Sequence, residues 1–314
     1  MRALTYEGYG PVQVLAVREV TDPRPEPGEV LVRVRAAALN PKDVMLRKGR
    51  FRLLSGARFP KIVGLDFAGE IVGAGRGTRT PGQGTQVFGF LGGWSALRGT
   101  VAQYLVASPR EVAPMPHACS FEEAAAIPLA GSTALQALRD LARVRSGARI
   151  CIHGASGGVG TFAIQIAKFL GAIVTTTSSA ASRPRCLALG ADEALDYAVA
   201  DPFTNRSFDV VFDAFGNRSL SEARHALTAH GVYVTTVPSR RILLDTLRTF
   251  IGYPRARLVA VRSRAADLEQ LARLVDEGRL RPQIDRVVPL TEAVEAVRHL
   301  ETRHAHGKVI IRIE

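Results

Sequence analysis

The sequence has few cysteines and no long apolar run. Three cysteines in 314 residues, at positions 119, 151 and 186, are too few for a disulfide framework and lack the spacing of a cysteine-rich zinc lobe. No stretch of about 20 apolar residues occurs, and the start MRALTYEGYG lacks the apolar core of a secretory signal. We therefore expect a soluble protein of a reducing compartment, the cytoplasm.

Lysine is also scarce. Only the residues at 42, 48, 61, 168 and 308 are lysines, so the formal net charge of +12 is an arginine excess. Such a charge suits nucleic acid, an anionic membrane surface or anionic small molecules. The arginines are scattered, however, and alternate with Asp and Glu in stretches such as 139–149 and 262–281, as on an ordinary solvated surface. We expect no nucleic-acid partner and at most a peripheral contact with a membrane.

The length favours two lobes, because 314 residues exceed the ~250–300 at which one hydrophobic core usually stops growing. The first hundred residues contain short β-type runs at 30–36, 70–72 and 85–90, separated by Gly and Pro turns. This pattern predicts a mostly-β lobe. At Ser120 the S-x-x-E spacing of a capping box opens an Ala-rich helix.

Strands and helices alternate from residue 149 onward. Strands are predicted at 149–153, 173–177, 194–196, 210–213, 232–237 and 258–261, and helices at 158–170, 220–228 and 268–277. This alternation implies a parallel sheet covered on both faces. The tail differs, with a strand at 286–290, a helix at 291–302 and a strand at 308–313. We predict an α/β protein with a mostly-β catalytic domain over 1–122 and 264–314, a doubly wound parallel-sheet nucleotide-binding domain over 123–263, and a cleft between them.

The segment 153–160, His-Gly-Ala-Ser-Gly-Gly-Val-Gly, follows a predicted strand and opens a predicted helix. It fits the dinucleotide fingerprint G-x-G-x-x-G/A with Ala155 in the first place. The amides at the positive end of the helix would face a pyrophosphate. A plain tight loop is the alternative, which the flanking strand and helix disfavour. The candidate pyrophosphate-binding residues are Ala155, Ser156, Gly157, Gly158, Val159 and Gly160.

The next strand bears on the choice of cofactor. It ends Thr177-Ser178-Ser179, without the Asp or Glu that usually holds the ribose hydroxyls of NAD. Arg183 and Arg185 follow, and either could bind the 2′-phosphate of NADP by a bidentate fork. The alternative is that both are surface arginines. The missing acid favours NADPH, with Ser178 and Arg183 as candidate contacts.

The whole sequence resembles the medium-chain dehydrogenase/reductase superfamily and, within it, the zinc-independent NADPH:quinone oxidoreductases related to zeta-crystallin. The resemblance spans nearly the full chain. It is carried by the segments 38–43, 64–69, 99–104, 127–134, 153–160, 208–213 and 307–308. It implies a GroES-like catalytic lobe, a Rossmann nucleotide-binding domain and a homodimer.

The resemblance also addresses metal binding. Zinc alcohol dehydrogenases of this superfamily ligate catalytic zinc with a Cys, a His and a second Cys, and the matching positions here hold Asn40, Leu65 and Leu129. None of these is a useful zinc ligand. His304-x-His306 could suggest a metal, but two histidines near a helix end are more often solvated surface. We predict no metal.

Further site residues are implied by the resemblance alone. These are Tyr197 and Arg303 near the adenosine phosphate, Asn40 beside nicotinamide and substrate, Thr133 under the nicotinamide, and Thr236, Val237 and Pro238 against its carboxamide side. From the residues themselves, Asn40 could equally form an Asx turn before Pro41. One departure concerns Met45, which stands where relatives often have Tyr and cannot donate a hydrogen bond.

These features predict hydride transfer from NADPH to a quinone or an α,β-unsaturated carbonyl acceptor. Two alternatives remain open. One is an enone (enoyl) reductase with little quinone activity. The other is an NADPH-binding protein that acts by contacting RNA or a membrane, for which the basic and apolar segment 240–251 would be suited. We prefer to interpret that segment as a helix over the substrate cleft, because amphipathic helices usually face a core.

Overall fold

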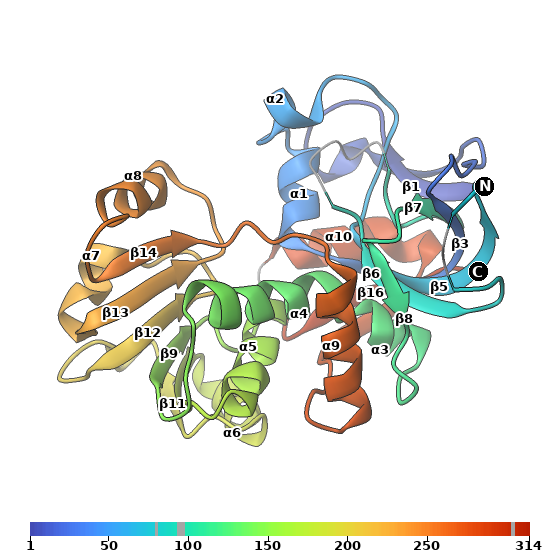
Figure 1. The fold of residues 1–314 in the computed structure, drawn as a ribbon. Coiled ribbons are helices and arrows are strands. Elements are labelled where there is room, and N and C mark those ends of the chain that lie inside the picture. Colours follow the sequence, from blue (N-terminus) through green and yellow to red (C-terminus); the bar gives the residue numbers. More distant parts are fainter. Residues whose placement is uncertain (79–80, 93–97, 303–304) are drawn as a thin grey trace. The chain divides into compact units, whose positions relative to one another are not determined.

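The computed structural model describes residues 1–78, 81–92, 98–302 and 305–314 of the chain. They form two compact units (Figure 1). The first unit comprises Met1–Leu129, Arg262–Gly278 and Pro282–Glu314, and the second comprises Ala130–Val261 and Arg279–Arg281. The chain thus leaves the first unit after residue 129, where the sequence pattern placed the boundary at 122, and returns to it after residue 261.

The first unit is mostly β, as predicted. Its strands are β1 (Arg2–Tyr6), β2 (Leu15–Glu19), β3 (Val30–Leu39), β4 (Lys61–Ile62), β5 (Asp66–Ala74), β6 (Gln86–Phe90), β7 (Tyr104–Ala107), β8 (Val112–Pro114), β15 (Ile284–Pro289) and β16 (Lys308–Arg312). One sheet has the order β2-β1-β4, and a seven-stranded sheet has the order β15-β16-β3-β5-β6-β8 with β7 paired to β3. Because β16 lies antiparallel to β3, the C-terminal segment completes a sheet begun by the N-terminal residues.

Short helices flank these sheets. They are α1 (Pro41–Arg47), α2 (Arg52–Ser55), α3 (Phe121–Ala125), α9 (Ala265–Asp276) and α10 (Ala293–Glu301), with 3-10 turns at Val12–Val14 and Leu290–Glu292. Helix α3 begins as the sequence predicts. The Ser120 hydroxyl accepts the Glu123 N–H at 3.3 Å, and the Glu123 carboxylate accepts the Ser120 N–H at 2.9 Å, which is the reciprocal pairing of a capping box.

The second unit contains a six-stranded sheet in which every neighbouring pair is parallel. Its strands are β9 (Arg149–His153), β10 (Ile173–Ser178), β11 (Glu193–Asp196), β12 (Phe208–Asp213), β13 (Leu227–Thr235) and β14 (Arg255–Leu258). Their order is β11-β10-β9-β12-β13-β14, which is the order of a dinucleotide-binding doubly wound sheet. The predicted fold class is confirmed.

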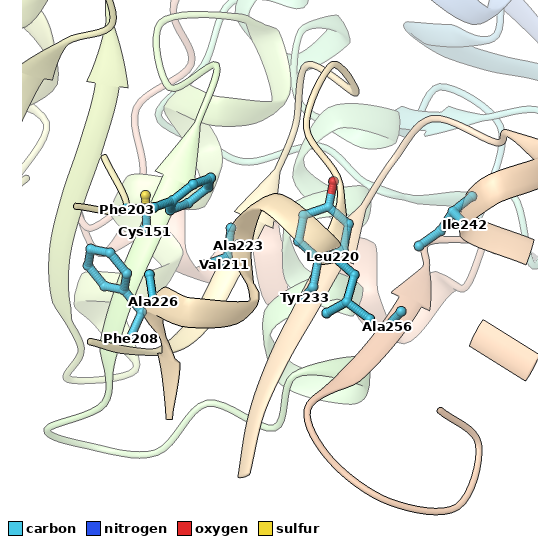
Figure 2. Packing of buried hydrophobic residues seen from close by; sticks show 10 residues of the cluster. All are labelled: Cys151, Phe203, Phe208, Val211, Leu220, Ala223, Ala226, Tyr233, Ile242 and Ala256. Carbon is cyan, nitrogen blue, oxygen red and sulfur yellow. The ribbon is translucent and has the colours of Figure 1, made fainter. Parts of the chain in front are cut away.

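Helices precede and connect these strands. They are α4 (Pro128–Leu135), α5 (Gly158–Phe169), α6 (Arg183–Ala188), α7 (Leu220–Ala223) and α8 (Arg240–Arg248), with a π-helix at Gln136–Leu141 and 3-10 turns at Ala180–Ser182 and Arg224–Ala226. Figure 2 shows part of the core, in which Phe208 and Tyr233 from the strands pack with Leu220 from α7 and Ile242 from α8. Among the described residues, no helix has the length and hydropathy needed to span a bilayer.

Three predicted elements of this unit are wrong in extent. The strand predicted at 232–237 is Leu227–Thr235. The last strand is Arg255–Leu258 rather than 258–261, because an edge strand needs little apolar surface and only Ala256 of these four residues is buried. The helix predicted at 220–228 ends at Ala223, because β13 already begins at Leu227, which pairs with Phe208 of β12.

Candidate functional site

The loop after β9 turns sharply at Gly154. This residue has φ +75°, and a Cβ there would lie 2.8 Å from Cβ of Phe215. Both the left-handed conformation and the close neighbour require glycine. The tight turn of the fingerprint therefore falls on Gly154, one residue before the Ala155 that the sequence pattern put in first place.

Gly157 and Gly160 have different surroundings. A Cβ at Gly160 would lie 2.4 Å from the carbonyl oxygen of Gly154 and 2.6 Å from Cα of Ala155, whereas a Cβ at Gly157 would meet nothing closer than 3.5 Å. Internal packing thus requires glycine at 160 but not at 157. An open backbone at 157, directly before the first residue of α5, fits a pyrophosphate that approaches the helix N-terminus.

The burial of the loop residues agrees with this difference between Gly157 and Gly160. Ala155 and Gly160 are buried, whereas Ser156, Gly158 and Val159 are partly exposed. Gly158 and Val159 open α5, so their N–H groups have no acceptor within the helix. The residues present therefore fit a bound dinucleotide phosphate.

The buried side chain of His153 supports the Gly154–Gly160 loop through two hydrogen bonds. Its Nδ1 lies 2.6 Å from the Thr177 hydroxyl and its Nε2 lies 2.7 Å from Oδ1 of Asn217. Burial lowers the pKa of His153, so the neutral ring is favoured. Because the Asn217 oxygen only accepts, Nε2 donates to it and Nδ1 accepts from Thr177. His153 thus joins the ends of β9 and β10 to the loop after β12.

The carboxylate that ends β12 also fixes the loop after that strand. The Asp213 carboxylate accepts the N–H groups of Phe215, Gly216 and Arg218 at 3.1, 2.7 and 2.9 Å, and the Tyr233 hydroxyl at 2.9 Å. Neither His153 nor Asp213 was predicted as a site residue. The available signal was a polar residue ending each of two buried strands.

The ends of β10 and β11 bring three predicted residues together. The Ser178 carbonyl accepts the N–H of Tyr197 at 3.2 Å, and Tyr197 is exposed. Arg183 begins α6, and its Nε donates to the carbonyl of Ala194 at 2.8 Å. The guanidinium is thereby anchored to β11 beside Ser178, which is paired with Asp196 in this sheet.

The remaining predicted cofactor residues follow β13. The Thr236 hydroxyl donates to the carbonyl of Ala214 at 3.1 Å, Val237 fills the space beside Gly216, and Pro238 comes next. They lie at the same carboxyl edge of the sheet as the Gly154–Gly160 loop, since all strands are parallel. Thr133 is buried in α4, and Arg303 lies outside the described residues.

In the first unit, strand register places three polar residues together. Val309 pairs with Leu39, and Ala38 pairs with Asp66, so Lys308, Asn40 and Asp66 meet at one end of β16, β3 and β5. All three side chains are buried. We call these residues the Asn40–Asp66–Lys308 cluster.

Hydrogen bonds fix the orientation of the Asn40 amide. Lys308 Nζ donates to Oδ1 of Asn40 at 2.6 Å and to Oδ2 of Asp66 at 2.8 Å. The Asn40 Nδ2 donates to Oδ2 of Asp66 at 2.9 Å and to the carbonyl of Ala38 at 3.3 Å. Asp66 Oδ1 accepts the Leu129 N–H at 2.6 Å, near the start of α4. The buried carboxylate is thus balanced by one ammonium and two N–H donors.

Asp43 adjoins this cluster. Its Oδ2 accepts the Asn40 N–H at 2.8 Å, while its buried Oδ1 has no partner among the described residues. Burial is the main cause that raises the pKa of Asp43 to about 7, and the Asp66 charge adds to it. This carboxyl group therefore takes up a proton near neutral pH.

Of these residues, only Asn40 was predicted as a site residue, and Asp66, Lys308 and Asp43 were not. One signal was a charged residue opening a buried apolar strand, in Asp66-Phe67-Ala68 and in Lys308-Val309-Ile310. Their pairing was not visible, since 242 residues separate Asp66 from Lys308.

The chain is similar to known proteins over its whole length. Residues 26–117 match the model of the alcohol dehydrogenase GroES-like domain, and 189–311 match that of the zinc-binding dehydrogenase. The chain is 34% identical over 325 residues to quinone-oxidoreductase QR1, chloroplastic, of Triphysaria versicolor, which covers 99% of this chain and 98% of the relative. It is 34% identical over 318 residues to the trans-enoyl reductase pgmF of Aspergillus terreus, with coverages of 92% and 87%.

A solved structure agrees with these similarities. The quinone oxidoreductase from Coxiella burnetii superposes with a TM-score of 0.92 at 32% identity, covering 100% of this chain and 99% of that one. The Rossmann and GroES-like assignments predicted from the sequence are therefore confirmed.

The residues do not fit the zinc that one of these family models names. By the family resemblance, Asn40, Leu65 and Leu129 stand at the positions matching catalytic zinc ligands, and two of the three have no donor atom in the side chain. Among the described residues, no group of three or more His, Cys, Asp or Glu is placed to hold a metal ion. The Lys308 ammonium lies between the oxygens of Asn40 and Asp66 instead.

The two loop glycines give a paired prediction. Gly160→Ala should lower the free energy of unfolding by about 1–3 kcal/mol, because its Cβ meets backbone atoms. Gly157→Ala should change it by less than about 1 kcal/mol yet weaken dinucleotide binding at least about tenfold. Urea unfolding and calorimetric titration measure these two effects. Equal affinity of Gly157→Ala and wild type would show that no phosphate approaches there.

The buried ion pair gives a second prediction. Lys308→Met should lower the free energy of unfolding by about 3–5 kcal/mol, because the Asp66 carboxylate is left buried without its cation. Lys168→Met breaks the exposed pair with Asp192 and should cost less than about 1 kcal/mol. Urea unfolding of both variants checks the contrast, and equal losses would contradict it.

A third prediction concerns pH. The folded chain keeps Asp43 protonated up to about pH 7, while the carboxyl group of the unfolded chain loses its proton near its ordinary pKa of 3.8. Asp43 therefore stabilises the fold most below pH 3.8, and this contribution falls by up to about 1.4 kcal/mol per pH unit as pH rises toward 7. Asp43→Asn should remove this slope. Unfolding measured from pH 4 to 7 tests it, and parallel curves for variant and wild type would contradict it.

Proposed function

The chain belongs to the quinone oxidoreductase family of the medium-chain dehydrogenase/reductase superfamily, and we propose from this premise that it reduces a quinone or an α,β-unsaturated carbonyl compound with NADPH. That it is a nicotinamide-dependent oxidoreductase follows from the family itself. The choice of NADPH and the class of acceptor are the proposed parts.

The observation that carries the proposal is the contrast between Gly157 and Gly160. Internal packing requires glycine at 160, whereas the backbone at Gly157 is open beside the N-terminus of α5. This is expected where a pyrophosphate lies against the backbone. When bound, the reduced nicotinamide supplies a hydride. The residues of the chain bind and orient it, and the His153 and Asp213 hydrogen bonds keep the loops around it in place.

The end of β10 supports NADPH over NADH. Ser178 and Ser179 stand where an NAD enzyme commonly has an acid. Arg183, anchored through Nε, keeps its two terminal nitrogens for a 2′-phosphate. The nearest acid in the sheet is Asp196, which is paired with Ser178 on the neighbouring strand. Its Oδ1 is engaged within its own loop, where it accepts the N–H of Ala198 at 3.0 Å. Tyr197 and Arg303 support the same assignment through the family resemblance.

For the acceptor, the proposed donor is the Asn40 amide. Lys308 Nζ on its Oδ1 polarises the amide and strengthens its N–H groups as donors. Of its two hydrogens, the one directed at Ala38 makes the longer bond, 3.3 Å, and is the one that a substrate carbonyl oxygen would take. A donor placed where negative charge develops lowers the barrier to hydride transfer. Thr133 would lie against the nicotinamide, as the family resemblance implies.

A second candidate is an enone reductase with little quinone activity. The trans-enoyl reductase relative has the same 34% identity to this chain as the quinone oxidoreductase relative, over 318 rather than 325 residues. Met45 favours this candidate, because it replaces a tyrosine that quinone reductases of the family often carry.

The test is oxidation of NADPH and of NADH by purified protein with a panel of simple quinones and of enones. We expect turnover with NADPH and at least one acceptor class. Arg183→Ala should raise the Michaelis constant for NADPH about tenfold or more and leave that for NADH little changed.

Two matched variants complete the test. Arg185→Ala shows which arginine meets the phosphate, and Arg149→Ala, on an exposed arginine at the amino end of β9, should have no effect. Equal use of NADH and NADPH by the wild type would overturn the cofactor assignment. Absence of turnover with every quinone and enone would overturn the proposed acceptors.

A further inference from the structure

The acid that caps α1 is buried. Asp43 is the third residue of this helix, and its Oδ2 accepts the N–H of Asn40 at 2.8 Å, as the acid of a capping box does. Glu123 has the same place in α3, where its carboxylate accepts the N–H of Ser120. Glu123 is exposed, however, whereas Asp43 is only 5% exposed. The same local motif thus leaves one acid in water and sets the other inside the first unit.

Several elements bring charged or titratable groups near Asp43. They are Tyr6 of β1, Asp66 of β5, Lys308 of β16, and Lys42 and Arg47 of α1 itself. Helix α10 also packs against α1, and its Glu301 forms an ion pair with Arg47. Burial raises the pKa of Tyr6, so this hydroxyl group stays neutral around pH 7. The charges that act on Asp43 are therefore mainly those of Asp66 and Lys308.

These neighbours compensate an ionised Asp43 poorly. The Lys308 ammonium already donates to Asp66 and Asn40. The Asp66 carboxylate repels a second negative charge, and Lys42 attracts it less than Lys308 does. Oδ1 of Asp43 is buried and has no hydrogen-bond partner among the described residues. Because a buried anionic oxygen without a donor is costly, the contacts favour a neutral carboxyl group, in agreement with the pKa of about 7 that burial gives Asp43.

We propose that Asp43 is a positioning residue for reduction of the acceptor, and that the Asn40 amide is an effective donor only while the Asp43 carboxyl group carries its proton. This inference rests on the proposed function, in which Asn40 donates to the acceptor oxygen. Negative charge develops on that oxygen as the hydride arrives. An ionised Asp43, bonded to the backbone of Asn40, repels this charge in a buried site and competes with Asn40 for the Lys308 ammonium.

Asp43 acts in this proposal only through its charge. It gives up no proton in the reaction, because the proton that completes the reduction comes from water. Activity is therefore present below the pKa of Asp43 and is lost as pH rises through about 7. A role in capping alone predicts a different result, since the carboxyl oxygen accepts the Asn40 N–H in either protonation state. Capping would give no pH dependence of turnover.

The experiment compares the pH profile of kcat in the full chain and in Asp43→Asn. The asparagine oxygen still accepts the Asn40 N–H, but the side chain cannot ionise. With saturating NADPH and the best quinone or enone acceptor, we expect wild-type kcat to fall at least about tenfold between about pH 5.5 and about pH 8.5. In Asp43→Asn the fall should be less than about threefold. The Michaelis constant for NADPH should show no such difference between the two proteins.

Glu123→Gln is the matched control. It makes the corresponding change at the same capping position of an exposed helix start, and its kcat should fall with pH as in the wild type. Circular dichroism at each pH checks that all three proteins remain folded.

Infrared spectroscopy follows the carboxyl group without any turnover. The C=O band of a protonated carboxyl group should be present in the wild type at about pH 6, disappear as pH rises through about 7, and be missing from Asp43→Asn at every pH of this range.

Three outcomes would overturn the proposal. They are parallel kcat profiles of wild type and Asp43→Asn, a wild-type kcat that rises with ionisation of Asp43, and identical carboxyl bands in the two proteins at about pH 6. The first two need turnover, so they leave the proposed function standing. Absence of turnover with every quinone and enone would instead overturn the proposed function, and the role of Asp43 with it.

Discussion

The arrangement of the first unit depends on one buried ammonium group. Lys308 Nζ lies between Oδ1 of Asn40 and Oδ2 of Asp66, where the ends of β16, β3 and β5 meet. A buried carboxylate is tolerated only if it is paired and its remaining lone pairs are satisfied. Asp66 meets this condition through Lys308, the Asn40 amide and the N–H of Leu129. Three strands and the start of α4 are thereby tied to a single charge balance.

The same hydrogen bonds fix the orientation of the Asn40 amide. An asparagine amide can rotate by half a turn at little cost, but here a cation on its oxygen and a carboxylate on its nitrogen admit one orientation. At the position that the family resemblance matches to a zinc ligand of alcohol dehydrogenases, the chain thus holds a neutral group aligned by a lysine. The positive charge in the Asn40–Asp66–Lys308 cluster belongs to the chain itself.

In the second unit, backbone geometry and buried polar groups hold the loops in place. Gly154 and Gly160 allow β9 and α5 to approach closely, and the neutral His153 and the Asp213 carboxylate hold the loops after β9 and β12. Each of these polar groups lies at the carboxyl end of a parallel strand. That edge is where an open doubly wound sheet presents its ligand, so the requirements of folding and of binding fall on the same residues.

The sequence by itself determined the two-part organisation, the doubly wound sheet and the loop at 154–160, because these depend on local periodicity and on glycines spaced a few residues apart. It misjudged the strand at 255–258 and the end of α7, where edge pairing and strand register override local preference. Only the tertiary structure decided that Lys308 meets Asp66 and Asn40, that His153 is hydrogen-bonded to Thr177 and Asn217, and that the leucines of α8 are exposed. The physical reason is that such contacts join residues distant in the chain, and strand register, which places them, is set by the packing of whole sheets.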